Sequence, residues 1–305
     1  MKVRYLDTLG LYPDIISTSC QNSLKIKDID FRVPCGKCLP CLKKRRSDWT
    51  LRLEHEYLES DSAYFVTLTY DNHNVPRTKE GYPTLYKKHV QDYIKRLRNS
   101  HVAYVVRELG LKTRKEVKNV SKPIRYFAVG EYGSKTRRPH YHIILFNMDI
   151  GNTNSLGTKW KYGHVDIGTV TGSSINYTTK YMFKQFGQKD KRIRPFTLMS
   201  KKPIIGNSYL EKYGKYHIIN GELQTRDMNG RSRRLPKAYI QRLFTNKEDR
   251  LELSRKSFEK HIHKKIDQFN KTLDTHYNGE VSKWCKSKEQ DNHRLINNII
   301  DLETI

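Results

Sequence analysis

Two strand-like segments joined by a short loop constrain this chain more than any other feature. Residues 124–130 and 140–146 are rich in β-branched, aromatic and aliphatic side chains, and glycine, serine and proline punctuate the loop between them. This pattern predicts a β-hairpin. Side chains alternate along a strand, so His140 and His142 share one face, and the antiparallel return brings Glu131 beside them.

Two imidazoles and one carboxylate on one face suit a catalytic divalent metal ion that keeps open coordination positions. We therefore expect Glu131, His140 and His142 to be metal ligands. The His-x-His pattern alone leaves an alternative open, because two histidines on a strand can also be hydrogen-bonded or exposed without binding a metal.

The charge of the chain points to a polyanionic partner. The 305 residues include 58 Lys and Arg against 32 Asp and Glu, which gives a net charge of +26. Twenty Tyr and ten Phe interleave with these cations and suit stacking on unpaired bases. A merely soluble basic protein is the alternative. We expect no membrane partner, because neither terminus carries a basic amphipathic stretch with a strong apolar face and no apolar signal core follows Met1.

Five cysteines, an odd number, do not resemble a disulfide framework. Cys35, Cys38 and Cys41 follow one another at intervals of three, and Cys20 lies upstream. Thiolates at this spacing suit structural zinc, although the full pattern is not a standard finger. Reduced, packed cysteines and a redox or iron–sulfur role are the alternatives. The basic residues that follow at once, Lys43, Lys44 and Arg45, are expected to contact phosphate.

The rest of the chain predicts helices and strands around the hairpin. Residues 47–60 predict a helix with Trp49, Leu53, Tyr57 and Leu58 on its apolar side, and residues 64–70 predict a strand. Further predictions are a helix at 85–98 with Val90, Tyr93, Ile94 and Leu97 buried, a Lys-rich insertion at 110–122, a polar loop at 151–163, a short strand at 165–170, a hairpin at 218–223 turning at Asn220-Gly221, and a helix from 247 to about 273.

A second group of candidate residues lies on a helix predicted from about Ile175 to Phe186, with its N-cap at 172–174. At roughly 100° per residue, its two sides differ in character. Ile175, Met182, Phe183 and Phe186 make an apolar side, and Tyr177, Lys180, Tyr181 and Lys184 lie on the other. Two surface aromatic residues of an ordinary helix are the alternative explanation for the tyrosine pair.

Together the two groups could perform phosphodiester transesterification. The metal would neutralise charge on the phosphate, a tyrosine hydroxyl would attack phosphorus, and Lys180 would stabilise the phenolate or the developing charge. Simple hydrolysis needs only water and leaves the tyrosine pair unexplained. Two tyrosines on one helix face allow two successive transfers.

These segments resemble the three ordered motifs of the HUH rolling-circle replication initiators. The resemblance lies in the strand 65–70, the hairpin with Glu131, His140 and His142, and the helix with Tyr177, Lys180 and Tyr181. It is greatest to the initiators of microviruses, particularly the gokushovirus branch, which residues 34–41, 130–133 and 198–203 also resemble. The likeness covers roughly residues 34–210.

The resemblance implies an α+β fold, a ferredoxin-like antiparallel sheet flanked by helices, with insertions and a basic, mostly helical C-terminal extension. It divides the chain into a Cys-containing segment (1–45), an HUH endonuclease domain (46–210) and the extension, a hairpin then helices (211–305). It also implies a Mg²⁺- or Mn²⁺-dependent nick at the replication origin of a small circular single-stranded DNA phage genome, in the host bacterial cytoplasm. The protein would stay on the 5′ phosphate and leave a 3′-OH for the host DNA polymerase.

We expect this protein to contact single-stranded and nicked origin DNA through Arg137, Arg138 and Lys184, besides the basic run after the cysteines. The sequence has no Gly-x4-Gly-Lys-Ser/Thr loop, so a host helicase is expected to unwind the DNA. Two other functions stay open. One is a non-enzymatic nucleic-acid-binding protein with a Cys-ligated zinc module. The other is a different HUH nickase, a relaxase or a single-strand transposase.

Overall fold

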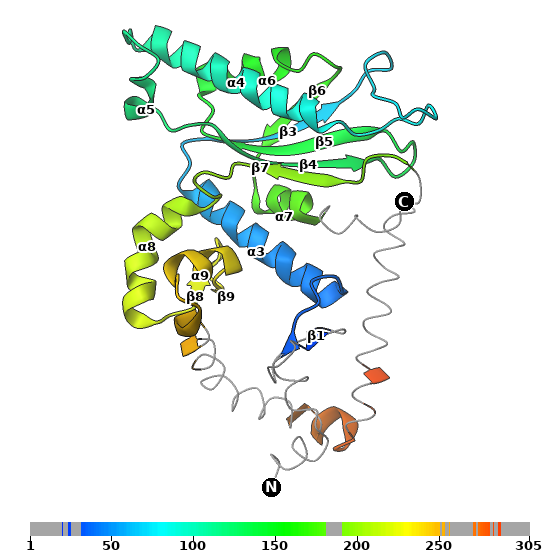
Figure 1. Cartoon of the computed structure of the whole chain (residues 1–305), viewed down its shortest axis with the longest axis vertical. Coiled ribbons are helices and arrows are strands. Elements are labelled where there is room, and N and C mark those ends of the chain that lie inside the picture. The colour runs from blue at the N-terminus through cyan, green and yellow to red at the C-terminus, as the bar shows by residue number, and fades with distance from the viewer. Residues whose placement is uncertain are drawn as a thin grey trace. The chain divides into compact units, whose positions relative to one another are not determined.

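The computed structural model describes residues 20, 24–25, 32–180 and 191–250, together with isolated positions between 252 and 287. The chain divides into two compact units. One comprises residues 46–216 and 224–236, and the other comprises residues 1–45, 217–223 and 237–305. The helices and strands of both units are labelled in Figure 1.

A five-stranded antiparallel sheet forms the centre of the unit that contains residues 46–216. Its order is β6-β3-β5-β4-β7. The strands are β3 (Ala63–Thr69), β4 (Arg125–Tyr132), β5 (Pro139–Phe146), β6 (Val165–Thr169) and β7 (Phe196–Met199). Numbered by their order in the chain, the first four strands lie in the spatial order 4-1-3-2 with helices in both crossovers, which is the ferredoxin-like arrangement. The α+β prediction is confirmed, and β7 extends the sheet beside β4.

Each face of the sheet has its own core, because side chains alternate along the strands. Helices α4 (Lys87–Glu108) and α6 (Asn154–Thr158) cover one face, over Val66, Tyr141 and Ile143. Helices α3 (Leu39–Leu58) and α7 (Gly172–Lys180) cover the other face, over β4 and β5 (Figure 1). His140 and His142 alternate with Tyr141 and Ile143, so they lie on the α3/α7 face.

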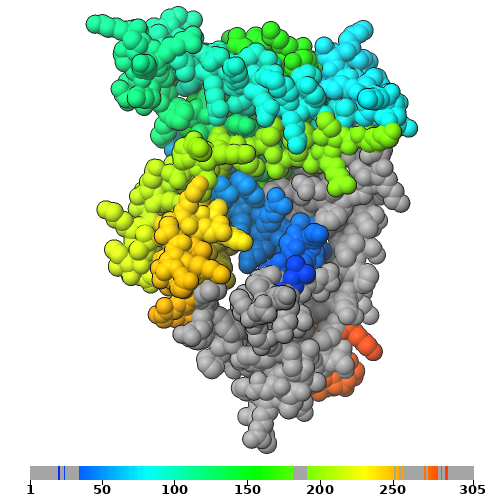
Figure 2. Space-filling view, viewed as in Figure 1, coloured from blue at the N-terminus to red at the C-terminus, as the bar shows by residue number. Residues whose placement is uncertain are grey.

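Helix α4 confirms the predicted apolar stripe and extends beyond it. Val90, Tyr93, Ile94 and Leu97 are all buried. The helix continues to Glu108 because Val105 prolongs the stripe. Its outer side carries exposed lysines and contributes the cyan surface in Figure 2.

Helix α3 is longer than the sequence predicted. It begins at Leu39 rather than near Ser47, so the basic run lies within its first turns. Leu53 is buried as expected, but Leu58, placed on the apolar side by the prediction, is 60% exposed. Leu51 is buried instead, because the sheet and the segments around it cover a broader side of α3 than one stripe.

The predicted hairpin at 218–223 is wrong. Residues there complete helix α8 (Asn207–Asn220), and Gly221, with φ of +60°, lies just after its last residue. Asn-Gly favours positive φ, which ends a helix as readily as it turns a hairpin. The hairpin comes later, between β8 (Gln224–Arg226) and β9 (Ser232–Arg234), and α9 (Lys237–Leu243) follows.

Short helices occupy two segments that the sequence left irregular. The 110–122 insertion contains α5 (Val117–Val120), and the 151–163 loop contains α6 after a 3-10 turn, η1 (Ile150–Asn152). Trp160 ends this loop in the core, where its indole N–H donates to the Thr69 carbonyl at 3.0 Å. At Gly163, φ is +148° and a Cβ would meet the backbone near Thr69, so only glycine fits.

Two elements complete the description. In the other unit, β1 (Leu24–Lys25) pairs antiparallel with β2 (Arg32–Val33). The predicted helix from 247 to 273 falls mostly outside the described residues. Among the residues that the structure describes, none of the helices combines the length and apolar character needed to cross a membrane.

Candidate active site

Three side chains predicted to bind a metal ion meet on the α3/α7 face of the sheet. In the β4–β5 pairing, Glu131 lies opposite His140 and Val129 lies opposite His142. Glu131 and His142 are buried, and His140 is half-buried at the rim. The hairpin therefore presents a carboxylate and two imidazoles from neighbouring strands at one place.

The ligand atoms of this group converge. Glu131 Oε1 lies 2.9 Å from His140 Nε2 and 3.1 Å from His142 Nε2. One ligand atom from each of the three residues fits within 4.8 Å of the others. Neighbouring ligands of an octahedral ion at about 2.1 Å lie about 3.0 Å apart, so these spacings suit a small divalent ion.

Bonds on the far side of each imidazole orient the pair. His140 Nδ1 lies 3.1 Å from the Arg138 carbonyl, which can only accept, so Nδ1 carries the proton. In the neutral ring this leaves an Nε2 lone pair directed at the Glu131 carboxylate, an arrangement that a shared cation stabilises. His142 Nδ1 lies 3.2 Å from the hydroxyl of Thr67, its partner across the β3–β5 pairing. The donor set thus fits a divalent metal ion.

The carboxylate of Glu131 is held in its charged form. Burial by itself raises the pKa of Glu131, but the hydrogen bonds and charges of His140 and His142 outweigh burial and lower that pKa below its ordinary value. An ionised carboxylate is the form that binds a metal ion.

Tyr177 lies against this group. Its ring centroid is 5.3 Å from that of His142, with the rings nearly perpendicular, and 6.2 Å from that of Phe65. Phe65 in turn stacks on His142 at 5.6 Å. Tyr177 is 45% exposed, so one side of its phenol ring contacts the candidate ligands and the other is accessible to a DNA strand.

Helix α7 is fixed at its start and along its buried side. Thr171 and Ser174 cap it reciprocally, each hydroxyl accepting from the other's backbone N–H at 3.2 Å. The cap is therefore Thr171, one residue before the predicted 172–174. Ile175 is fully buried against the sheet.

Helix α3 also holds α7. The Thr50 and Thr179 hydroxyls lie 3.1 Å apart, and Thr179 donates to the Ile175 carbonyl, so Thr50 donates to Thr179. The guanidinium of Arg46 donates to the Asn176 carbonyl at 2.9 Å. These contacts set the rotation of α7 and therefore the direction of Tyr177.

The remaining predicted residues differ in what the structure shows. Lys180 is half-buried at the end of α7, while Tyr181 and Lys184 lie outside the described residues. Arg137 is exposed in the hairpin loop with φ of +53°. Arg138 has a structural role that the sequence analysis missed, because its guanidinium donates to the Tyr70 carbonyl and to Asn72 and ties the loop to the end of β3. Lys43, Lys44 and Arg45 are exposed.

Sequence reasoning also missed polar residues on β3 and just before and on β6. Thr67 orients His142, and its signal was present, because 65, 67 and 69 alternate on one face of a predicted strand. His164 and Asp166 pair with Thr69 and Thr67, so they lie on the same face as the ligand group, and both are exposed. Their position could not be inferred without the strand order.

Known proteins resemble this chain over the same region. The family model for the replication-associated protein ORF2 matches residues 63–186, which span β3 to α7 and include every candidate site residue on the sheet. The replication-associated protein VP4 of Bdellovibrio phage phiMH2K is 28% identical over 226 residues, 68% of this chain and 66% of that protein. The replication-associated protein ORF2 of Spiroplasma virus 4 is 27% identical over 69% of this chain and 67% of its own length. The chain belongs to the microvirus-type replication-associated proteins.

Two further comparisons are more limited. The replication-associated protein ORF4 of Chlamydia phage 1 is 30% identical over 53% of this chain and 40% of its own length. The matches thus span two thirds or less of their relatives, 66% for the Bdellovibrio phage protein. A solved nuclease domain of the minute virus of mice non-structural protein 1 is 11% identical with a TM-score of 0.18, which is too low to compare the folds.

Proposed function

We propose that this replication-associated protein is a site-specific single-strand DNA endonuclease and strand transferase that initiates rolling-circle replication of a small circular phage genome. One observation carries the proposal: an exposed tyrosine, Tyr177, lies against a carboxylate–imidazole group suited to a divalent metal ion. The relatives named above support a role in replication. Their phage origin supports action in the host bacterial cytoplasm.

Glu131, His140 and His142 would hold the metal ion, Mg²⁺ or Mn²⁺. When bound, the ion supplies Lewis-acid chemistry, neutralising charge on a phosphate oxygen. Thr67 and the Arg138 carbonyl keep both imidazoles turned toward that place. Burial of Glu131 keeps water away from the charged side of the group.

Tyr177 is the proposed nucleophile. Its hydroxyl oxygen bonds to phosphorus, and the bond from phosphorus to the 3′ oxygen breaks. The phenol proton leaves to solvent, on the exposed side of the ring, and the 3′ oxygen takes up a proton to become the 3′-OH. The products are a 5′-phosphotyrosine and a primer for the host DNA polymerase. Lys180, three residues further along α7, would stabilise the negative charge of the phenolate or the transition state.

A second tyrosine would complete the cycle. We propose that Tyr181 cuts the regenerated origin while the first phosphotyrosine is still in place, and that the released 3′-OH then attacks that phosphotyrosine and closes the circle. The exposed Lys43, Lys44, Arg45 and Arg137 would contact the phosphate backbone, together with Lys184. Arg138 would act by holding the loop in place. A host helicase would open the duplex.

The test incubates the purified protein with a single-stranded origin oligonucleotide and Mn²⁺ and resolves products on a denaturing gel. We expect a covalent adduct that the double substitution Tyr177→Phe and Tyr181→Phe abolishes while DNA affinity stays near normal. Tyr213→Phe is the matched control, since that tyrosine is 41% exposed on α8, close to the 45% of Tyr177. Full activity of the double variant would remove both tyrosines from the mechanism. No adduct and no nick with any origin strand would favour a non-enzymatic DNA-binding protein.

A further inference from the structure

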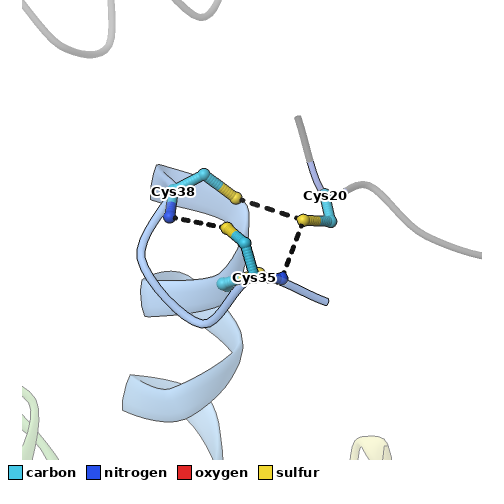
Figure 3. A group of neighbouring side chains, drawn as sticks. Cys20, Cys35 and Cys38 are labelled. Atoms are coloured by element: carbon cyan, nitrogen blue, oxygen red, sulfur yellow. Dashed lines mark hydrogen bonds between the residues drawn. The ribbon is translucent and has the colours of Figure 1, made fainter. Parts of the chain in front are cut away.

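Four of the five cysteines come together in the unit that contains the N-terminal segment. Cys20, Cys35, Cys38 and Cys41 are free and half-buried, and their sulfur atoms all lie within 4.8 Å of one another. Figure 3 shows three of them, with the Cys20 and Cys38 sulfurs facing each other. This group shares no residue with the candidate active site, and the proposed DNA chemistry leaves it without a role.

The sulfur spacing fits tetrahedral coordination. Cys38 Sγ lies 3.7 Å from Cys20 Sγ. A disulfide needs about 2.05 Å between sulfurs. Four thiolates around a zinc ion at about 2.3 Å place neighbouring sulfurs about 3.8 Å apart. The observed separation is therefore that of two ligands of one ion.

The turn between Cys35 and Cys38 directs backbone N–H groups at sulfur. Gly36 has φ of +73°, which curls the chain around Cys35 Sγ. Cys35 Sγ then accepts from the N–H groups of Lys37 at 3.4 Å and Cys38 at 3.3 Å. Cys20 Sγ accepts from the Cys35 N–H at 3.2 Å. Donors to sulfur stabilise its charged form, the form that binds a metal ion, whereas a neutral thiol packed in a core needs no such donors.

The elements that carry these cysteines are small and need support. The β1–β2 ribbon between Cys20 and Cys35 has two residues per strand, below the size at which a hairpin is stable alone. Cys38 immediately precedes α3, and Cys41 lies in its first turn. An ion bound by all four sulfurs would join the segment before the ribbon to the start of the helix.

We propose that Cys20, Cys35, Cys38 and Cys41 form a structural zinc site. Four protein ligands leave no open coordination position, which is the pattern of a structural rather than a catalytic centre. Thiolate ligands select soft ions, while the Glu131 group offers the nitrogen and oxygen ligands that suit other divalent metals. The site is closed, and its function is to fix the start of α3 and the ribbon.

The experiment measures bound metal in the purified full-length protein by mass spectrometry after dialysis. About one zinc ion per chain should remain. Cys38→Ser should lose it. Two controls should retain it: Cys285→Ser, which changes the fifth cysteine, and His140→Ala, which alters the candidate active site. Protein grown with Co²⁺ in place of Zn²⁺ should show the near-ultraviolet charge-transfer band of thiolate–cobalt bonds and strong d–d bands in the red.

The cobalt spectrum and the metal content of the wild-type protein do not depend on whether Cys38→Ser folds. A mercurial reagent that titrates the wild-type thiols should release the zinc in proportion to the cysteines modified. Wild-type protein without retained zinc would overturn the proposal. So would iron in place of zinc, or a cobalt spectrum without the thiolate band.

Discussion

Thr67→Val tests whether the orientation of His142 controls metal affinity. The Thr67 hydroxyl lies 3.2 Å from His142 Nδ1, and Val has nearly the same shape without the hydroxyl. Losing such a partner of a ligating histidine costs about 10–100-fold in metal affinity. We therefore expect the Mn²⁺ concentration for half-maximal nicking to rise about 10–100-fold, the equivalent of about 1.4–2.7 kcal/mol.

The matched control is Thr69→Val. Thr69 is half-buried on the same strand and the same face, but its hydroxyl donates to the His164 carbonyl at 3.4 Å rather than to a candidate ligand. Its metal midpoint should move less than about threefold. Nicking rates over a Mn²⁺ titration, and calorimetric Mn²⁺ binding without DNA, give the two midpoints. Equal shifts in the two variants would refute the idea that Thr67 acts through His142.

Three further predictions follow from the same contacts. Glu131→Gln should abolish metal binding and nicking; in the metal-free wild type, the lowered pKa of Glu131 stabilises the fold above about pH 4.5, and this stabilisation is lost as the pH falls further, so urea midpoints should drop more steeply with acid in wild type than in Glu131→Gln. Thr50→Val should cost about 1 kcal/mol of unfolding free energy and slow adduct formation about fivefold without moving the metal midpoint, whereas Thr178→Val, whose hydroxyl bonds to the Ser174 carbonyl within α7, should leave adduct formation at its wild-type rate relative to folded protein. Replacing Lys43, Lys44 and Arg45 by Ala should lower the salt dependence of single-stranded DNA binding by about two in log–log slope, and the same change at Lys87, Lys88 and Lys95 on the outer side of α4 should leave that slope unaltered.

The local parts of this fold could be predicted from the sequence because periodicity determines faces. Strict alternation placed His140, His142 and Glu131 on one side of a hairpin, and the 3.6-residue period identified the buried stripe of α4. These features depend on neighbours within a few residues, so no knowledge of distant contacts was needed.

Features that depend on distant contacts could not be predicted. Whether Tyr177 contacts His142 depends on which face of the sheet α7 covers, and Thr67 becomes a partner of His142 only because β3 lies beside β5. Asn220-Gly221 was misread because the same positive-φ preference serves a helix end and a hairpin turn. The spacing of Cys20 gave no reason to place it with the other three cysteines, since fourteen residues and a ribbon intervene.

The central claim is that a tyrosine beside the Glu131–His140–His142 group becomes joined to DNA. Its most direct test is mass spectrometry of the peptide–nucleotide adduct formed with an origin oligonucleotide and Mn²⁺. The account predicts a 5′-phosphate ester on Tyr177 or Tyr181. A nicked strand with free ends and no adduct, or an ester on a tyrosine outside residues 172–186, would contradict it.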